Sequence, residues 1–134
     1  MKAEGAMGID LTDRESRVRL AKLLTNLFDR WSLSTSERLG LLGLRPSNRA
    51  LLSRYRNGTP LPNRRDVLER AGWLLAIHKA LRLLFPRNPK LRYSWVGRPN
   101  KDFHNRSPLE VMIRDGMIGL FRVSRYLDLE LDQF

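Results

Sequence analysis

The sequence predicts an all-α fold, in which a helix-turn-helix N-terminal half is joined by a long shared helix to a small helical C-terminal half. Apolar residues recur at steps of three and four along most of the chain, which is the spacing of one face of an α-helix. Capping-box patterns stand at residues 12–15, 34–37 and 107–110, where we expect helices to begin. Breaks that contain proline or glycine separate the periodic segments and mark where one helix is expected to end and the next to begin.

Composition narrows the functional classes. The 134 residues have an apolar share of 42%, which is enough for a packed interior, and the absence of cysteine excludes disulfides and thiolate metal sites. We expect no secretory signal, because the first nine residues contain one lysine and too short an apolar run. We expect no membrane span, because the most apolar run, residues 71–85, contains His78, Lys79 and Arg82 and is too short to cross a bilayer. The protein is therefore predicted to be cytoplasmic.

Charge is the most informative property of the composition. The formal net charge is +11, from 25 Lys and Arg against 14 Asp and Glu, and most of the basic residues are arginine. Arginine binds phosphate and carboxylate groups with a planar fork of donors, so this balance favours a polyanionic partner, most often nucleic acid. The alternative is a soluble basic protein whose arginines are only solvated.

The N-terminal part begins with a predicted flexible arm at residues 1–11, which are small, polar and glycine-bearing. The first helix is expected to begin at the first capping box, with Thr12 as its cap. Its core face is expected to consist of Leu20, Ala21, Leu24, Leu27, Phe28 and Trp31. A second helix is predicted to begin near Thr35 and to be short, because Gly40 and Gly43 follow closely.

A third helix is predicted over residues 48–56, with Ser47 as its cap and Asn57-Gly58 as its left-handed end. The residues expected to face inward are Leu51, Leu52 and Tyr55. A short helix, a glycine-bearing turn and a second short helix form the helix-turn-helix pattern, which we assign to residues 12–62.

The helix-turn-helix region has the charge pattern of a DNA-binding surface, because no acidic residue occurs between Glu37 and Asp66. The second helix of such a motif lies in the major groove, where Asn48 is suited to adenine and Arg49 to guanine. The expected DNA-binding residues are Arg45, Ser47, Asn48, Arg49, Ser53, Arg54, Arg56, Arg64 and Arg65. The last four arginines are better placed to hold phosphates than to read bases. The alternative is an arginine-rich face that is only solvated.

Residues 63–134 are predicted to contain the shared helix and the C-terminal half. The long helix, over residues 64–85, is apolar around much of its circumference, so we expect it to be buried on several sides or to form a dimer interface. Asn88 is expected to cap a short helix, and two more helices are predicted over residues 108–114 and 116–131. In the last helix, the predicted core residues are Met117, Leu120, Val123, Leu127 and Leu131, and the predicted exposed residues are Ile118, Phe121 and Tyr126.

Two sets of motifs resemble one known family. Trp95, Pro99-Asn100, Ser107-Pro108-Leu109 and Gly116 stand in the order found in the toxin-binding domain of the Xre/MbcA/ParS antitoxins. The segments WSLS, LLGL, RYRNG and LER, which begin at residues 31, 41, 54 and 68, resemble the Xre-type helix-turn-helix of the same antitoxins. The resemblance covers residues 23 to about 127.

This resemblance implies an antitoxin with two activities. It implies binding to a RES-domain toxin, an enzyme class that consumes or transfers parts of NAD, and occlusion of the toxin's active-site cleft. It also implies a homodimer that binds operator DNA and represses its own operon. The expected toxin-binding residues are Trp95, Arg98, Pro99, Asn100, Phe103, Tyr126, Asp128, Glu130, Asp132, Gln133 and Phe134. The acidic tail departs from the family pattern, in which a glycine often follows the last helix.

The sequence gives no sign of catalysis, of a cofactor or of a metal site. Its two histidines, His78 and His104, stand in no recognisable catalytic frame, and no glycine-rich phosphate loop or cluster of metal ligands is present. Two other functions stay open. One is a stand-alone helix-turn-helix transcriptional regulator with a C-terminal dimerisation domain. The other is an RNA-binding helical module, which is less favoured because Tyr55 is the only stacking aromatic near the basic face.

Overall fold

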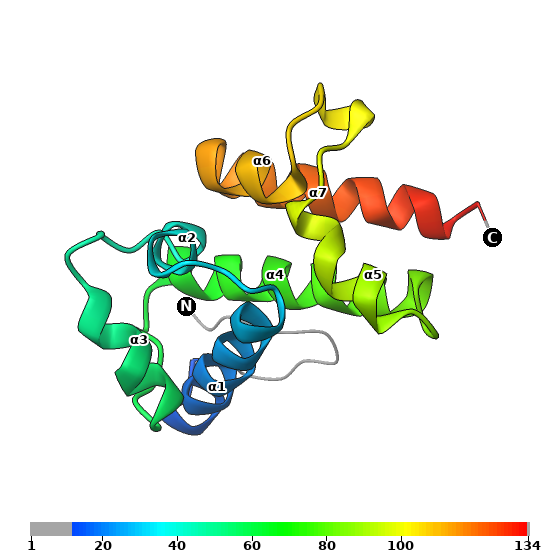
Figure 1. The fold of residues 1–134 in the computed structure, drawn as a ribbon. Helices are drawn as coiled ribbons and strands as arrows, with labels where there is room; N and C mark the ends of the chain where they lie inside the picture. Colours follow the sequence, from blue (N-terminus) through cyan, green and yellow to red (C-terminus); the bar gives the residue numbers. More distant parts are fainter. Residues whose placement is uncertain (1–11, 134) are drawn as a thin grey trace. The chain divides into compact units, whose positions relative to one another are not determined.

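The computed structural model describes residues 12–133, and every regular element among them is helical (Figure 1). Seven α-helices and two short 3-10 turns follow one another along this part of the chain, which confirms the predicted all-α fold. The predicted arm at residues 1–11 and the terminal Phe134 lie outside the described residues. The chain divides into two compact units, one ending at Gly72 and the other beginning at Trp73.

The first helix, α1, spans Arg14–Arg30 and supplies much of the N-terminal core. Asp13 caps it rather than the predicted Thr12, because the Asp13 carboxylate accepts a hydrogen bond from the Ser16 backbone N–H at 2.7 Å. A charged carboxylate also interacts favourably with the helix dipole at this end, which explains why Asp13 is preferred. The predicted core face is confirmed, since the buried residues include Leu20, Ala21, Leu24, Leu27, Phe28 and Trp31.

The second helix, α2, spans Thr35–Leu41 and begins with the predicted capping box. The Ser34 hydroxyl accepts a hydrogen bond from the Glu37 N–H, and the Glu37 carboxylate accepts one from the Ser34 N–H. Gly43, in the turn after α2, has a φ of +69°, and a Cβ there would lie 2.8 Å from Nε of Arg70. Glycine therefore allows both the left-handed turn and the close approach of Arg70.

The third helix, α3, spans Arg49–Arg56 and begins one residue later than predicted. Its cap position is Asn48 rather than Ser47, because the Asn48 N–H donates to the Arg45 carbonyl and closes a turn just before the helix. The end agrees with the prediction, since Gly58 adopts a φ of +107°. The inward face is confirmed by its burial: Tyr55 is buried, and Leu51 and Leu52 are half-buried.

One arginine of α1 fixes the segment that follows α3. Nη1 of Arg17 donates to the Leu61 carbonyl at 2.8 Å, and the Leu61 N–H donates to the Arg17 carbonyl at 3.2 Å. The Leu61 side chain is fully buried. These contacts hold the end of α3 near α1, and so they fix which face of α3 is left exposed.

The fourth helix, α4, spans Arg65–Leu84, and its second half begins the C-terminal unit. In that half the buried residues are Leu74, Ile77, Ala80 and Leu81. Asn88 caps α5 (Pro89–Ser94), as predicted, because its side chain accepts a hydrogen bond from the Leu91 N–H. Trp95 opens a 3-10 turn, η2 (Trp95–Gly97), just after this helix.

The last two helices, α6 (Pro108–Arg114) and α7 (Gly116–Leu131), have the bounds that the sequence predicts. The Ser107 hydroxyl caps α6 by accepting a hydrogen bond from the Glu110 N–H at 3.1 Å. The two helices approach closely at Gly119, where a Cβ would overlap the carbonyl oxygen of Val111. Glycine is therefore required at this crossing.

The faces of α7 differ in exposure. Leu120, Val123 and Leu127 are buried, whereas the other predicted core residues, Met117 and Leu131, lie at the ends of the helix and are half-buried. Ile118 and Phe121 are exposed, as predicted. Tyr126, which was also predicted to be exposed, is half-buried because its ring packs against two aromatic side chains, those of Trp95 and Phe103.

Candidate functional site

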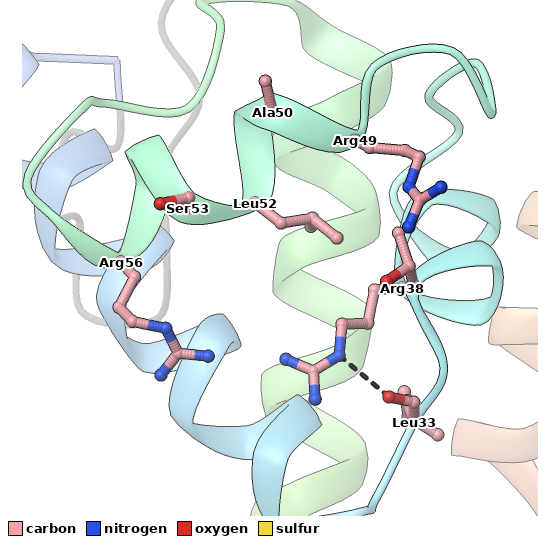
Figure 2. Close-up of a pocket in the computed structure, with 8 residues that line it drawn as sticks. Leu33, Arg38, Arg49, Ala50, Leu52, Ser53 and Arg56 are labelled. Atoms are coloured by element: carbon pink, nitrogen blue, oxygen red, sulfur yellow. Dashed lines mark hydrogen bonds between the residues drawn. The ribbon is translucent and has the colours of Figure 1, made fainter.

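The N-terminal unit carries an open pocket of about 490 Å³ beside α2 and α3 (Figure 2). Its lining residues are Leu33, Thr35, Arg38, Arg49, Ala50, Leu52, Ser53 and Arg56. Arg38 comes from α2, and Arg49 and Arg56 come from the two ends of α3. Figure 2 shows the three guanidinium groups around one space. Guanidinium and hydroxyl donors arranged in this way can bind a phosphate or a carboxylate group.

Asp29, near the end of α1, orients two of these arginines. Its carboxylate accepts hydrogen bonds from Nη1 and Nη2 of Arg56 at 2.6 and 2.9 Å, and from Nη1 of Arg38 at 2.7 Å. The hydrogen bond from Arg56 first, and then that from Arg38, holds the pKa of Asp29 far below its usual value. The pKa of Arg56 is raised by the same contact. Arg38 and Arg56 therefore share one ionised carboxylate. With Arg49 the pocket contains three guanidinium groups, so it remains positively charged.

The predicted DNA-binding residues lie mostly at the surface. The exposed ones are Arg45, Ser47, Arg49, Ser53, Arg54, Arg56, Arg64 and Arg65, and Asn48 is half-buried. Three of the arginines form ion pairs with acids: Arg56 with Asp29, Arg64 with Asp66 at 2.9 Å, and Arg65 with Glu69 at 2.8 Å. Arg45, Arg49 and Arg54 have no acidic partner among residues 12–133, so they are the most available for a phosphate.

Two polar residues of the pocket, Thr35 and Arg38, are absent from the predicted set. The Arg38 side chain is 16% exposed, and its Nε donates to the Leu33 carbonyl at 3.0 Å (Figure 2). A signal for Arg38 does exist in the sequence, because it is the first residue of the acid-free interval that follows Glu37. Thr35 has no comparable signal, since a threonine at the start of a helix is common.

The C-terminal unit carries a cluster of three aromatic side chains, from Trp95, Phe103 and Tyr126. The Tyr126 ring is stacked on Trp95, with centroids 6.1 Å apart, and tilted against Phe103, with centroids 5.1 Å apart. The Tyr126 hydroxyl donates to Oδ2 of Asp102 at 2.9 Å. Burial first, and then this hydrogen bond, raises the pKa of Tyr126, so the phenol stays protonated at neutral pH.

The loop between η2 and α6 folds around Asn100 and contains a second 3-10 turn, η3 (Lys101–Phe103). The side-chain oxygen of Asn100 accepts a hydrogen bond from the Asp102 N–H at 2.9 Å. The main-chain carbonyl oxygen of Asn100 accepts hydrogen bonds from the N–H groups of Phe103 and Asn105. The Asn100 N–H donates to the Arg106 carbonyl at 3.1 Å. Asn100, which was predicted to bind a toxin, therefore determines the shape of this loop.

The predicted toxin-binding residues fall into two groups in the structure. Those that pack locally are Trp95, Asn100, Phe103 and Tyr126, and all four are half-buried. Those that are exposed are Arg98, Pro99, Asp128, Asp132 and Gln133; Glu130 is half-buried, and Phe134 lies outside the described residues. Because α7 continues to Leu131, Asp128 and Glu130 lie on its last turn rather than on an extended tail.

A second pocket, of about 340 Å³, lies beside the aromatic cluster, and we refer to it as the α7 groove. Its lining residues are Asp102, Phe103, His104, Arg106, Val111, Phe121, Arg122, Arg125, Tyr126 and Leu129. Of these residues, Phe103 and Tyr126 belong to the predicted toxin-binding set and the other eight do not. The signals in the sequence that pointed to this face of α7 were the predicted exposed positions of Phe121 and Tyr126.

The described residues meet neither the requirements for a membrane-spanning helix nor those for a cluster of metal ligands. No helix within residues 12–133 is long and apolar enough to cross a membrane. Over the same residues, no group of three or more histidines and acids is arranged to hold a metal ion.

One known protein family and one individual protein are similar to this chain. Residues 80–129 match the family described as the antitoxin Xre/MbcA/ParS C-terminal toxin-binding domain. The matched segment includes the aromatic cluster and the α7 groove. The chain is also 36% identical over 100 residues to the uncharacterized protein y4oB of Sinorhizobium fredii (strain NBRC 101917 / NGR234), an alignment that covers 75% of this chain and 74% of that protein.

Proposed function

We propose that the chain is an antitoxin of the family that carries the Xre/MbcA/ParS C-terminal toxin-binding domain, that it neutralises a RES-domain toxin in the cytoplasm and that it represses its own operon. The match of residues 80–129 to that domain is the observation that carries the proposal. The RES class, with its NAD-consuming or ADP-ribosylating activity, is proposed from the resemblance of the motifs around Trp95 and Gly116.

Neutralisation is proposed to occur by occlusion of the toxin's active-site cleft. In this mechanism Trp95, Phe103 and Tyr126 shape the loop before α6, and the exposed residues Arg98 and Pro99 at its start contact the toxin. The acidic residues at the end of the chain contribute a second contact. These are Asp128, Glu130 and Asp132, followed by Gln133 and Phe134.

Co-expression with the neighbouring reading frame tests this part of the proposal. We expect the chain to co-purify with that gene product and to restore growth of cells that express it. A chain that lacks residues 132–134 keeps all of α7 and tests the tail alone. Full rescue of growth by this shortened chain would remove Asp132, Gln133 and Phe134 from the mechanism, but not Asp128, Glu130 or the toxin as a partner.

Repression is proposed to depend on a homodimer that places two copies of α3 in successive major grooves, about 34 Å apart. Asn48 and Arg49 are proposed to contact base edges, and Arg45 and Arg54 to contact phosphates. Arg45, Arg49 and Arg54 have no acidic partner within the described residues, which supports this assignment, as does the positive pocket around Arg38. Binding to a duplex from the region upstream of the gene, measured by fluorescence anisotropy at several salt concentrations, is the test.

A second candidate is a stand-alone transcriptional regulator whose C-terminal unit only dimerises. The exposed apolar side chains of Ile118, Phe121 and Leu129 favour it, because exposed apolar patches often mark protein interfaces. This candidate predicts a dimer that binds the upstream duplex, captures nothing from the neighbouring frame and gives no rescue of growth. The co-expression experiment therefore separates the two.

A further inference from the structure

One face of α7 exposes apolar side chains. Ile118, Phe121 and Leu129 are 63%, 49% and 47% exposed, and their spacing of three and eight residues places them on the same side of a helix. Phe121 is held in place, because its ring meets the edge of the Trp73 ring with centroids 5.7 Å apart. A fixed and exposed apolar stripe of this kind is typical of a surface that another protein covers.

The α7 groove lies along this stripe and adds positive charge to it. Its apolar lining comes from Phe103, Val111, Phe121 and Leu129, and its basic lining from Arg106, Arg122 and Arg125. Arg106 and Arg122 both approach the Asp115 carboxylate, but only at 3.5 Å. Arg125 has no acidic partner among residues 12–133, and it is exposed. The groove therefore offers apolar contacts next to a cation that lacks a counter-charge.

This combination argues against two other occupants. A second copy of the chain, paired through the same face, would add a second Arg122 and a second Arg125 to one interface, and like charges that share an interface are unfavourable. A nucleic acid would find aliphatic side chains at Ile118 and Leu129, which offer no flat surface on which bases could stack. A protein segment with apolar and acidic side chains satisfies both features.

We propose that the α7 groove and the adjoining stripe are the docking surface for the toxin, and that they receive a toxin segment in which apolar side chains stand beside an aspartate or glutamate. The proposal rests on the proposed toxin-binding function and assigns that function to a surface. At the centre of this docking surface, the Phe121 and Leu129 side chains make the apolar contacts and Arg125 pairs with the acidic residue of the toxin. The exposed loop residues and the tail then make peripheral contacts.

Matched variants of the full chain test the proposal by affinity for the purified toxin. Leu129→Asp and Arg125→Glu are expected to weaken binding at least tenfold. The controls are Leu83→Asp, which makes the same change at a leucine that is 59% exposed on α4, and Lys90→Glu, which reverses an exposed charge on α5. Both controls are expected to bind like the wild type.

Covalent labelling tests the same surface without disrupting it. The chain has no cysteine, so Leu129→Cys and Leu83→Cys each create a single site for a maleimide reagent. Bound toxin is expected to protect position 129 from labelling and to leave position 83 reactive. If the wild type binds the toxin, but Leu129→Asp binds equally well and position 129 stays reactive in the complex, the proposal is wrong and the toxin-binding function stands. If the wild type binds no toxin, both are overturned.

Discussion

Tyr126 on α7 donates a hydrogen bond to Asp102, 24 residues earlier in the chain, at 2.9 Å. The same ring contacts Trp95 and Phe103. The Tyr126 side chain thus joins α7 to both 3-10 turns, through Trp95 in η2 and through Asp102 and Phe103 in η3. The shape of the loop before α6 depends on this residue, although most of the loop's own hydrogen bonds are local.

Substitutions of Tyr126 should separate the hydrogen bond from the ring contacts. Tyr126→Phe keeps the ring and loses one partly exposed hydrogen bond, so it is expected to lower the free energy of unfolding by about 0.5–1.5 kcal/mol. Tyr126→Ala also loses two aromatic contacts and the burial of the ring, so a loss of about 2 kcal/mol or more is expected. Urea denaturation measures both values. Equal losses for the two variants would show that the ring contacts contribute nothing.

Gly119 and Gly72 provide a matched pair of helix glycines. Gly119→Ala places a methyl group against the Val111 carbonyl, so it is expected to destabilise the protein by about 1–3 kcal/mol. Gly72→Ala meets no atom within 4 Å and lies in the interior of α4, so it is expected to stabilise the protein by about 0.5–1 kcal/mol. Thermal or urea unfolding measures both. A neutral Gly119→Ala would mean that α6 and α7 do not approach as closely as described.

Because Asp29 forms ion pairs with Arg38 and Arg56, the free energy of unfolding is expected to depend on pH in the acidic range. The pKa of folded Asp29 lies below its ordinary value of 3.8, so the pairs stabilise the fold fully above that value and are lost as the pH falls through the lower folded pKa. Because the Asp29 side chain is 40% exposed, each pair is expected to contribute at most about 1 kcal/mol. Wild type and Asp29→Asn, compared by urea denaturation, should differ at pH 7 and converge progressively below pH 3.8. A difference that grows in acid would contradict the assignment.

Arg49 and Arg54 are predicted to affect DNA binding differently. Arg49→Ala should cost about 1–3 kcal/mol at the specific site and little at an unrelated duplex, because it removes a base contact. Arg54→Ala should weaken binding to both duplexes. It should also reduce the slope of log affinity against log salt concentration by about 1, because one phosphate contact is lost. Anisotropy titrations measure both effects, and Arg87→Ala, an exposed arginine outside the helix-turn-helix region, is the control. An unchanged affinity of Arg49→Ala for the operator would refute its role.

The fold was predictable from the sequence where its determinants are local. The bounds of α6 and α7 follow from a serine cap, a proline at the first helical position and a glycine between the helices, all within a few residues of the boundary they set. The two capping errors, at Thr12 and Ser47, arose where neighbouring residues were also suitable caps. Asp13 prevailed through its charge, and a turn that ends at Asn48 shifted the start of α3.

The candidate sites were less predictable, because they depend on contacts between distant residues. Asp29 and Arg56 are 27 positions apart, and no periodic pattern indicates that they meet. Trp95 and Tyr126 were predicted to contact a toxin, and nothing in the sequence showed that they would stack on each other. The α7 groove was missed for the same reason, since it combines side chains of α7 with those of the loop before α6 and of α6 itself.

The most direct test of the account is the NAD-consuming activity of the purified toxin from the neighbouring reading frame, measured as this chain is added. We expect a stable complex and loss of the activity in proportion to the chain added, with Leu83→Asp as effective as the wild type and Arg125→Glu at least tenfold weaker. A chain that binds the upstream duplex, yet leaves the toxin fully active at every concentration, would contradict its central claim.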